Sequence, residues 1–96
     1  MIINFKSQAT QDIYDGISSK QARKISLTVW KVAQRKLDMI NAALNLSDLK
    51  VPPGNRLEPL EGRLDGFHSI RINDQYRIIF RFKDSNAYDV EITDYH

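Results

Sequence analysis

The chain has no cysteine and only two histidines, and this excludes several familiar kinds of site. Without a thiol there can be no disulfide, cysteine nucleophile or thiolate metal site. The histidines show no HxH or HExxH spacing, and no GxGxxG, P-loop or GxSxG motif occurs. We therefore expect a protein that works without a metal or cofactor.

Long apolar runs are also missing. No stretch approaches the roughly 18 apolar residues of a membrane-spanning helix, and the N-terminus does not resemble a signal peptide. We therefore expect a cytoplasmic protein that does not contact a membrane. With 96 residues, of which 42% are hydrophobic and 27% charged, the composition is typical of one ordered globular domain spanning residues 1–96.

The net charge of +2 conceals a segregation of charge along the chain. Residues 20–36 contain six basic and no acidic residues, whereas residues 84–96 contain four acidic residues and no lysine or arginine. A basic segment suits a polyanionic partner, of which nucleic acid is the first candidate. A solvated helix face explains the same charges, and the pattern alone favours neither interpretation.

Apolar periodicity in the first half of the chain predicts helices. A short strand is expected at residues 1–6 and a short helical turn at residues 12–16, ending at glycine. Ser18 and Gln21 fit a capping box that opens a long helix reaching about Leu46. Within it, apolar residues recur three or four apart on one stripe, on which Trp30 is expected to anchor the core. The stripe consists of Ile25, Val29, Trp30, Ala33, Leu37, Ile40 and Leu44.

The second half of the chain alternates as strands do. A short, proline-limited edge strand is expected at residues 56–60, followed by strands at 67–73, 76–82 and 87–93. Together they predict an antiparallel meander whose apolar face is covered by the helices, an α+β architecture. The inward side chains are expected to include Tyr76, Ile78, Phe80, Phe82, Tyr88, Val90 and Ile92.

Arginines share the opposite face of this sheet. Arg71, Arg77 and Arg81 all fall on the parity that points away from the apolar face. A carboxylate on a neighbouring strand would explain any one of them, but Arg77 lies on a central hairpin strand rather than at its end. Arg71 and Arg77, together with Glu58 and the terminal Tyr95 and His96, suggest a catalytic set.

Such a set suits metal-free cleavage of RNA by its own 2′-hydroxyl. A carboxylate can take the 2′ proton, a histidine can protonate the departing 5′-oxygen, and an arginine can stabilise the charged phosphorane. By strict alternation His96 shares the parity of buried Val90 and Ile92, so the strand must twist or end near Asp94 for His96 to reach the arginines. A solvated end group is the alternative.

The stretches 52–60 and 66–78 and the closing Asp94-Tyr95-His96 resemble the HigB (plasmid-maintenance killer) branch of the RelE toxin superfamily. The similarity covers essentially the whole chain. It implies a RelE-like fold: an N-terminal strand, with one short and one long helix packed on one face of an antiparallel meander of about four strands. It also implies a type II toxin that cuts mRNA on the ribosome and is neutralised by a helix-turn-helix, HigA-like antitoxin.

The same resemblance implies roles for individual residues. Glu58 matches a general base found in some members, Arg77 the arginine that stabilises the scissile phosphate, and His96 the general acid. Substrate contacts are expected from Arg56, His68, Arg71, Asp94 and Tyr95, with His68 read as packing or stacking. A non-catalytic nucleic-acid-binding or antitoxin-binding module on the same fold is the alternative, since fold alone does not fix function.

Overall fold

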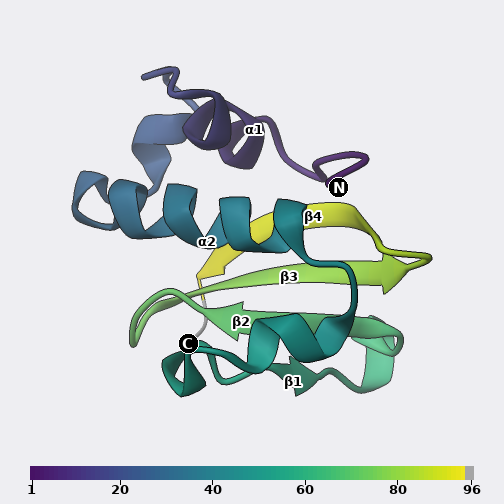
Figure 1. Cartoon of the computed structure of the whole chain (residues 1–96). Helices are drawn as coiled ribbons and strands as arrows, with labels where there is room; N and C mark the ends of the chain where they lie inside the picture. The colour runs from purple at the N-terminus through teal and green to yellow at the C-terminus, as the bar shows by residue number, and fades with distance from the viewer. Residues whose placement is uncertain (95–96) are drawn as a thin grey trace.

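The computed structural model describes residues 1–94, and the fold is a four-stranded antiparallel sheet covered on one face by two helices (Figure 1). The sheet order is β1-β2-β3-β4, which confirms the predicted meander. The elements are α1 (Gln8–Asp15), α2 (Trp30–Ala42), β1 (Glu58–Pro59), β2 (Phe67–Arg71), β3 (Tyr76–Lys83) and β4 (Asn86–Asp94). Short 3-10 turns occur at Ala22–Lys24, Leu27–Val29, Leu46–Lys50, Pro53–Asn55 and Gly62–Leu64.

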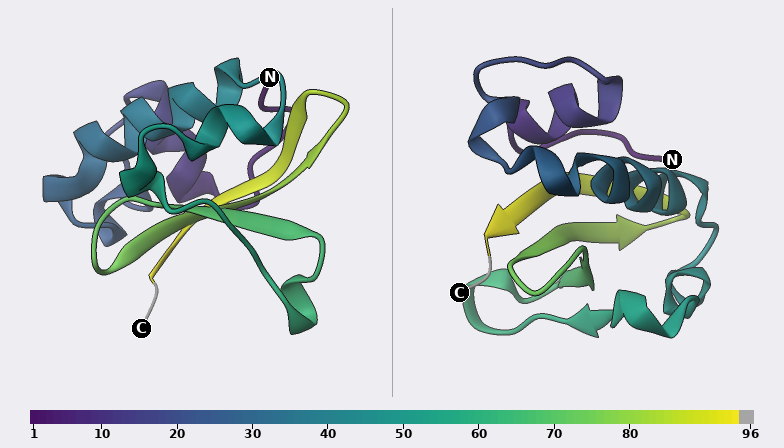
Figure 2. Two further views of the ribbon diagram at one scale, coloured as in Figure 1. Left: turned by 60° about the horizontal axis from the view of Figure 1, so that its bottom comes forward. Right: turned by 90° about the vertical axis from the view of Figure 1, so that its left-hand side faces the viewer.

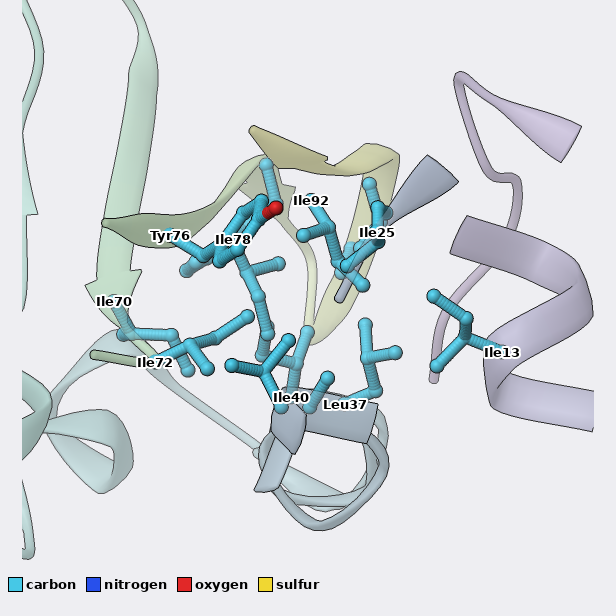
Figure 3. Close-up of a cluster of buried hydrophobic side chains, with 14 of the residues drawn as sticks. Ile13, Ile25, Leu37, Ile40, Ile70, Ile72, Tyr76, Ile78 and Ile92 are labelled. Atoms are coloured by element: carbon cyan, nitrogen blue, oxygen red, sulfur yellow. The ribbon is translucent and has the colours of Figure 1, made fainter. Parts of the chain in front are cut away.

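The core lies between α2 and the inner face of the sheet. Leu37 and Ile40 from the helix meet Ile70 and Ile78 from β2 and β3, all fully buried (Figure 3). Burying such a side chain contributes about 1.5–3 kcal/mol relative to leaving it exposed. Figure 2 shows both α-helices and the segment at residues 46–50 on this side, so that neither α1 nor α2 lies over the opposite face.

The first helix, α1, has a clear signal at each end. Ser7 caps its start, with the side-chain oxygen accepting the Thr10 N–H at 3.2 Å. Gly16 ends it with a φ of 75°, the left-handed conformation that glycine adopts without strain. The predicted helical turn ending at Gly16 is confirmed, although the helix begins at Gln8 rather than Asp12.

The long helix starts later than predicted, at Trp30 instead of Ser18. Two 3-10 turns occupy the segment before it because hydroxyl groups there bind the backbone. Ser19 accepts the Ala22 N–H and donates to Asp12, and Ser26 accepts the Thr28 N–H. The capping box expected at Ser18 was therefore wrong: the hydroxyl that accepts a backbone N–H belongs to Ser19, and only a 3-10 turn follows it.

Trp30, the first residue of α2, was predicted to anchor the core. Its ring is partly buried against the core cluster, and Nε1 donates to the Ile25 carbonyl at 2.9 Å. Ile25 and Val29 are buried as well, although both precede the helix. The apolar stripe therefore predicted the burial of Ile25 and Val29 correctly although it misplaced the start of the helix. At the other end it was wrong, because α2 ends at Ala42 rather than near Leu46 and Leu44 is 71% exposed.

The N-terminal segment runs parallel to β4 rather than forming a full strand. Isolated bridges join Ile2 to Ala87 and Phe5 to Val90. The side-chain amide of Asn4 makes two hydrogen bonds with Asp89: it accepts the Asp89 N–H at 3.0 Å and donates to the Asp89 carboxylate at 2.8 Å. The N-terminal segment therefore covers the β4 edge of the sheet.

A bulge in β4 breaks the alternation expected for that strand. Asp89 has a φ of 52°, and the pairing with β3 shifts between Ile79 and Arg81. As a result Tyr88 pairs with Arg81 and is only half-buried, whereas Val90 is fully buried. The expectation that Tyr88 points inward was wrong.

Candidate functional site

Arg77 is the central arginine on the face of the sheet that points away from the helices. Its side chain is far less exposed than a place on that open face predicts. It lies on β3 with only 8% of its surface exposed. Its Nε donates to the Ser69 hydroxyl at 2.9 Å, and one terminal nitrogen donates to the Arg56 carbonyl at 2.8 Å. The guanidinium is therefore held in one orientation by β2 and by the loop before β1.

Glu58 approaches this guanidinium from the edge strand. The register places Glu58 directly opposite Ser69, the residue that holds Arg77. One carboxylate oxygen of Glu58 lies 3.9 Å from a terminal nitrogen of Arg77, and its side chain is 53% exposed. This is a loose ion pair whose carboxylate is partly exposed to solvent.

The loop before β1 is shaped by a buried asparagine. Asn55 is fully buried, and its amide donates to the Leu49 carbonyl at 3.2 Å. The next residue, Arg56, has a φ of 46°, a conformation that side chains other than glycine seldom adopt. This turn directs the Arg56 carbonyl toward Arg77.

Arg71 stands beside Arg77, and the two residues are partners in the β2–β3 register. An ion pair with Asp74 holds Arg71 at the hairpin. Within that hairpin, the Asn73 side-chain oxygen accepts the N–H groups of Gln75 at 2.9 Å and Tyr76 at 2.7 Å. The polar turn predicted at residues 73–75 is therefore present, and it positions one wall of the site.

These residues enclose a hollow of about 180 Å³ on the open face of the sheet. It is lined by Arg56, Arg71, Asn73, Asp74 and Arg77. Three guanidinium groups against one carboxylate favour an anion, and the planar fork of arginine matches phosphate oxygens in particular. We refer to this hollow as the arginine pocket.

Of the predicted site residues at positions 94–96, the structure describes Asp94, the last residue of β4. Asp94 pairs with Tyr76 in the sheet, and its carboxylate accepts a hydrogen bond from Gln75 at 3.0 Å. Tyr95 and His96 lie outside the described residues. The structure therefore brings Glu58, Arg71 and Arg77 together, and the predicted acid remains a prediction.

His68 is on the opposite side of the sheet from the arginine pocket. It pairs with Phe80 of the core, and the two rings stack with centroids 6.4 Å apart. Its Nδ1 is buried without a hydrogen-bond partner in the described chain. This supports the packing role considered for His68 and does not bring it to the arginines as a substrate contact.

Three site residues were missed from the sequence: Ser69, Asn73 and Asp74. A signal for Ser69 was present, since it shares the parity of Arg71 in the alternating strand. Asn73 and Asp74 were assigned only to the turn. Within residues 1–94, no three acidic or histidine side chains gather as a metal site, and the expectation of metal-free chemistry stays a prediction.

Fold and site together define a small α+β protein with an arginine-rich pocket on the open face of its sheet. The family model described as "RelE-like toxin of type II toxin-antitoxin system HigB" matches residues 3–96. Toxin HigB-1 of Vibrio cholerae serotype O1 is 42% identical over 87 residues, covering 91% of this chain and 90% of that protein. The chain therefore belongs to the HigB-like family of type II toxins, as the resemblance implied.

Further relatives agree with this assignment. Endoribonuclease HigB of Proteus vulgaris is 32% identical over 71 residues, covering 68% of this chain and 77% of that protein. A chain of the Staphylococcus aureus YoeB-YefM toxin-antitoxin complex superposes with a TM-score of 0.63 at 22% identity, covering 100% of this chain and 95% of that one. YafQ from E. coli strain BL21(DE3) gives 0.57 at 18% identity, with 98% and 91% covered. At these identities the two structures show the fold alone.

A type II toxin is paired with an antitoxin, so an antitoxin is a partner of this chain. The basic segment at residues 20–36 is largely on the surface, with Lys20, Arg23, Lys24, Lys31 and Arg35 exposed. No helix within residues 1–94 has the length and apolarity required to cross a bilayer.

Proposed function

We propose that this toxin is an endoribonuclease that cuts mRNA on the ribosome without a metal ion. The observation that carries the proposal is the arginine pocket together with Glu58 beside it: Arg77, which lines the pocket and is held by Ser69 and the Arg56 carbonyl, lies 3.9 Å from the partly exposed carboxylate of Glu58. A fixed cation beside an accessible base suits phosphoryl transfer. The relative from Proteus vulgaris carries the name of an endoribonuclease, which supports the same activity.

In the proposed reaction the 2′-oxygen of the RNA attacks the adjacent phosphorus, and the bond from phosphorus to the 5′-oxygen breaks. Glu58 accepts the 2′ proton, and His96 donates a proton to the departing 5′-oxygen. Arg77 stabilises the charge that develops on the phosphorane, and Arg71 and Arg56 bind the same phosphate or its neighbour. The products are a 2′,3′-cyclic phosphate and a 5′-hydroxyl.

The ribosome and an antitoxin are the proposed partners in this function. With few side chains of its own around the reacting atoms, the toxin gains from a ribosome that holds the mRNA in place. Exposed lysines and arginines of residues 20–35 would contact ribosomal phosphates. We propose a helix-turn-helix antitoxin of the HigA type, and the cytoplasm as the place of action because translating ribosomes are there.

Mapping mRNA ends with and without translating ribosomes tests the catalytic assignment. Wild type should cut only with ribosomes, and His96→Ala and Glu58→Gln should each lower the rate by about 10²–10⁴-fold, the usual contribution of a general acid or base. Glu61→Gln is the matched control, since Glu61 is an exposed glutamate in the same region. Equal cutting by wild type and His96→Ala would refute the role of His96. Binding of antitoxin or RNA without cutting by wild type would favour the non-catalytic module.

A further inference from the structure

Lys36 is a buried lysine behind the arginine pocket. The sequence placed it in the basic segment, yet only 7% of its surface is exposed, whereas its helix neighbours Lys31 and Arg35 are exposed. Its ammonium donates a hydrogen bond to the backbone carbonyl of Arg71. The side chain of Lys36 therefore reaches from α2 to the end of β2, where Arg71 lines the arginine pocket.

Burying the charged side chain of Lys36 costs folding free energy that an apolar side chain filling the same space would not cost. Burial lowers the pKa of Lys36, and the positive charges of Arg35, Arg71 and Arg77 lower it further. Within residues 1–94 the ion pairs are formed by Arg71, Arg77 and Arg81, and none of them includes Lys36. A methionine of similar length would occupy the helix face without desolvating a charge.

The carbonyl that Lys36 binds belongs to a residue with a direct partner in the site. Arg71 and Arg77 face each other across β2 and β3, so the end of β2 sets the spacing between two of the three pocket guanidinium groups. An arginine pair can stabilise one phosphorane only if its spacing is held, and displacements near 1 Å can cost about a hundredfold in rate.

We propose that Lys36 is a positioning residue for RNA cleavage. It fixes the end of β2 so that Arg71 and Arg77 meet one phosphate, and it adds a positive charge beneath the pocket. The inference rests on the proposed endoribonuclease function, because it assigns Lys36 to the same site.

The test compares the cleavage of mRNA by wild type, Lys36→Met, Lys36→Arg and Lys83→Met on translating ribosomes, over a range of ribosome concentrations. Lys83→Met is the control because it removes an equal charge from an exposed position at the end of β3, outside the basic segment at residues 20–36. Thermal melting of each protein gives the folded fraction, so that each rate is expressed per folded molecule. This removes the effect of a merely structural role.

We expect Lys36→Met to lower the saturating rate per folded molecule by about tenfold or more, with the half-saturating ribosome concentration nearly unchanged. Lys36→Arg should recover most of this rate, and Lys83→Met should keep the wild-type saturating rate. A wild-type rate for Lys36→Met, an equal loss in Lys83→Met, or no recovery with arginine would each overturn the inference while leaving the proposed function intact. No cutting by wild type would instead refute the proposed function, and the inference with it.

Discussion

Ser69 offers the sharpest test of how Arg77 is held. Its hydroxyl is fully buried and accepts the Arg77 Nε–H at 2.9 Å. Replacing it with alanine leaves a charged donor in a site with little solvent, and hydrogen bonds to charged groups contribute about 1.5–3 kcal/mol. We therefore expect Ser69→Ala to lower the free energy of unfolding by about that amount, with a fall of roughly 4–8 °C in Tm for each kcal/mol.

The assay is urea unfolding followed by far-UV circular dichroism, with Ser18→Ala as the control. Ser18 is exposed, and within residues 1–94 the hydrogen bond that its hydroxyl accepts comes from Arg23 at 3.5 Å, so its loss should change stability by less than about 0.5 kcal/mol. Cleavage by folded Ser69→Ala should also slow, because the guanidinium keeps the Arg56 carbonyl but loses its second anchor. Wild-type stability together with a wild-type cleavage rate would refute the idea that Ser69 orients Arg77.

Two further predictions concern stability alone. Leu37→Ala should lower the free energy of unfolding in urea by about 2–5 kcal/mol because Leu37 is fully buried. Leu44→Ala is the control, since Leu44 is 71% exposed, and an equal loss of stability in both variants would contradict the described core. Asp89→Asn should lower the free energy of unfolding near neutral pH and make it fall less steeply on acidification, since hydrogen bonds from Asn4 and Arg81 lower the pKa of Asp89. The stabilisation that accompanies a lowered pKa is present above the unfolded pKa of about 3.9 and is lost as the pH falls through the folded pKa. If the free energy of unfolding of Asp89→Asn depended on acid pH as that of the wild type does, the prediction would be refuted.

The alternation of residues along the strands predicted most of the side chains on the open face of the sheet. Period two along β2 and β3 put Ser69, Arg71 and Arg77 on one side, and the register confirms that they share it. The burial of Arg77 could not be read in this way. It depends on a carbonyl from a loop 21 positions earlier, where Arg56 adopts a left-handed conformation that no local pattern indicates.

Alternation failed where distant residues set the local geometry. The bulge at Asp89 is stabilised by Asn4, 85 positions away in sequence, and no pattern within β4 marks it. The helix start failed for a related reason, since Ser19 is engaged by Asp12 of α1 rather than capping a long helix. Periodicity reports which side chains are buried, and it reports element boundaries only where backbone hydrogen bonds are local.

Arg77 has a structural role that any test of catalysis must separate from its chemistry. Its guanidinium joins β3 to β2 through Ser69 and to the preceding loop through Arg56, and it faces Glu58 on an edge strand of two residues. Removing it would therefore loosen the very strand that carries the proposed base, so a lost rate in Arg77→Ala would not by itself show that the arginine stabilises the phosphorane. Glu58→Gln leaves both hydrogen bonds of Arg77 in place, because the pair is loose at 3.9 Å. A severe loss of rate in Glu58→Gln with unchanged melting would therefore be evidence for chemistry, whereas a parallel loss of rate and stability would indicate that the pair mainly holds β1 against the sheet.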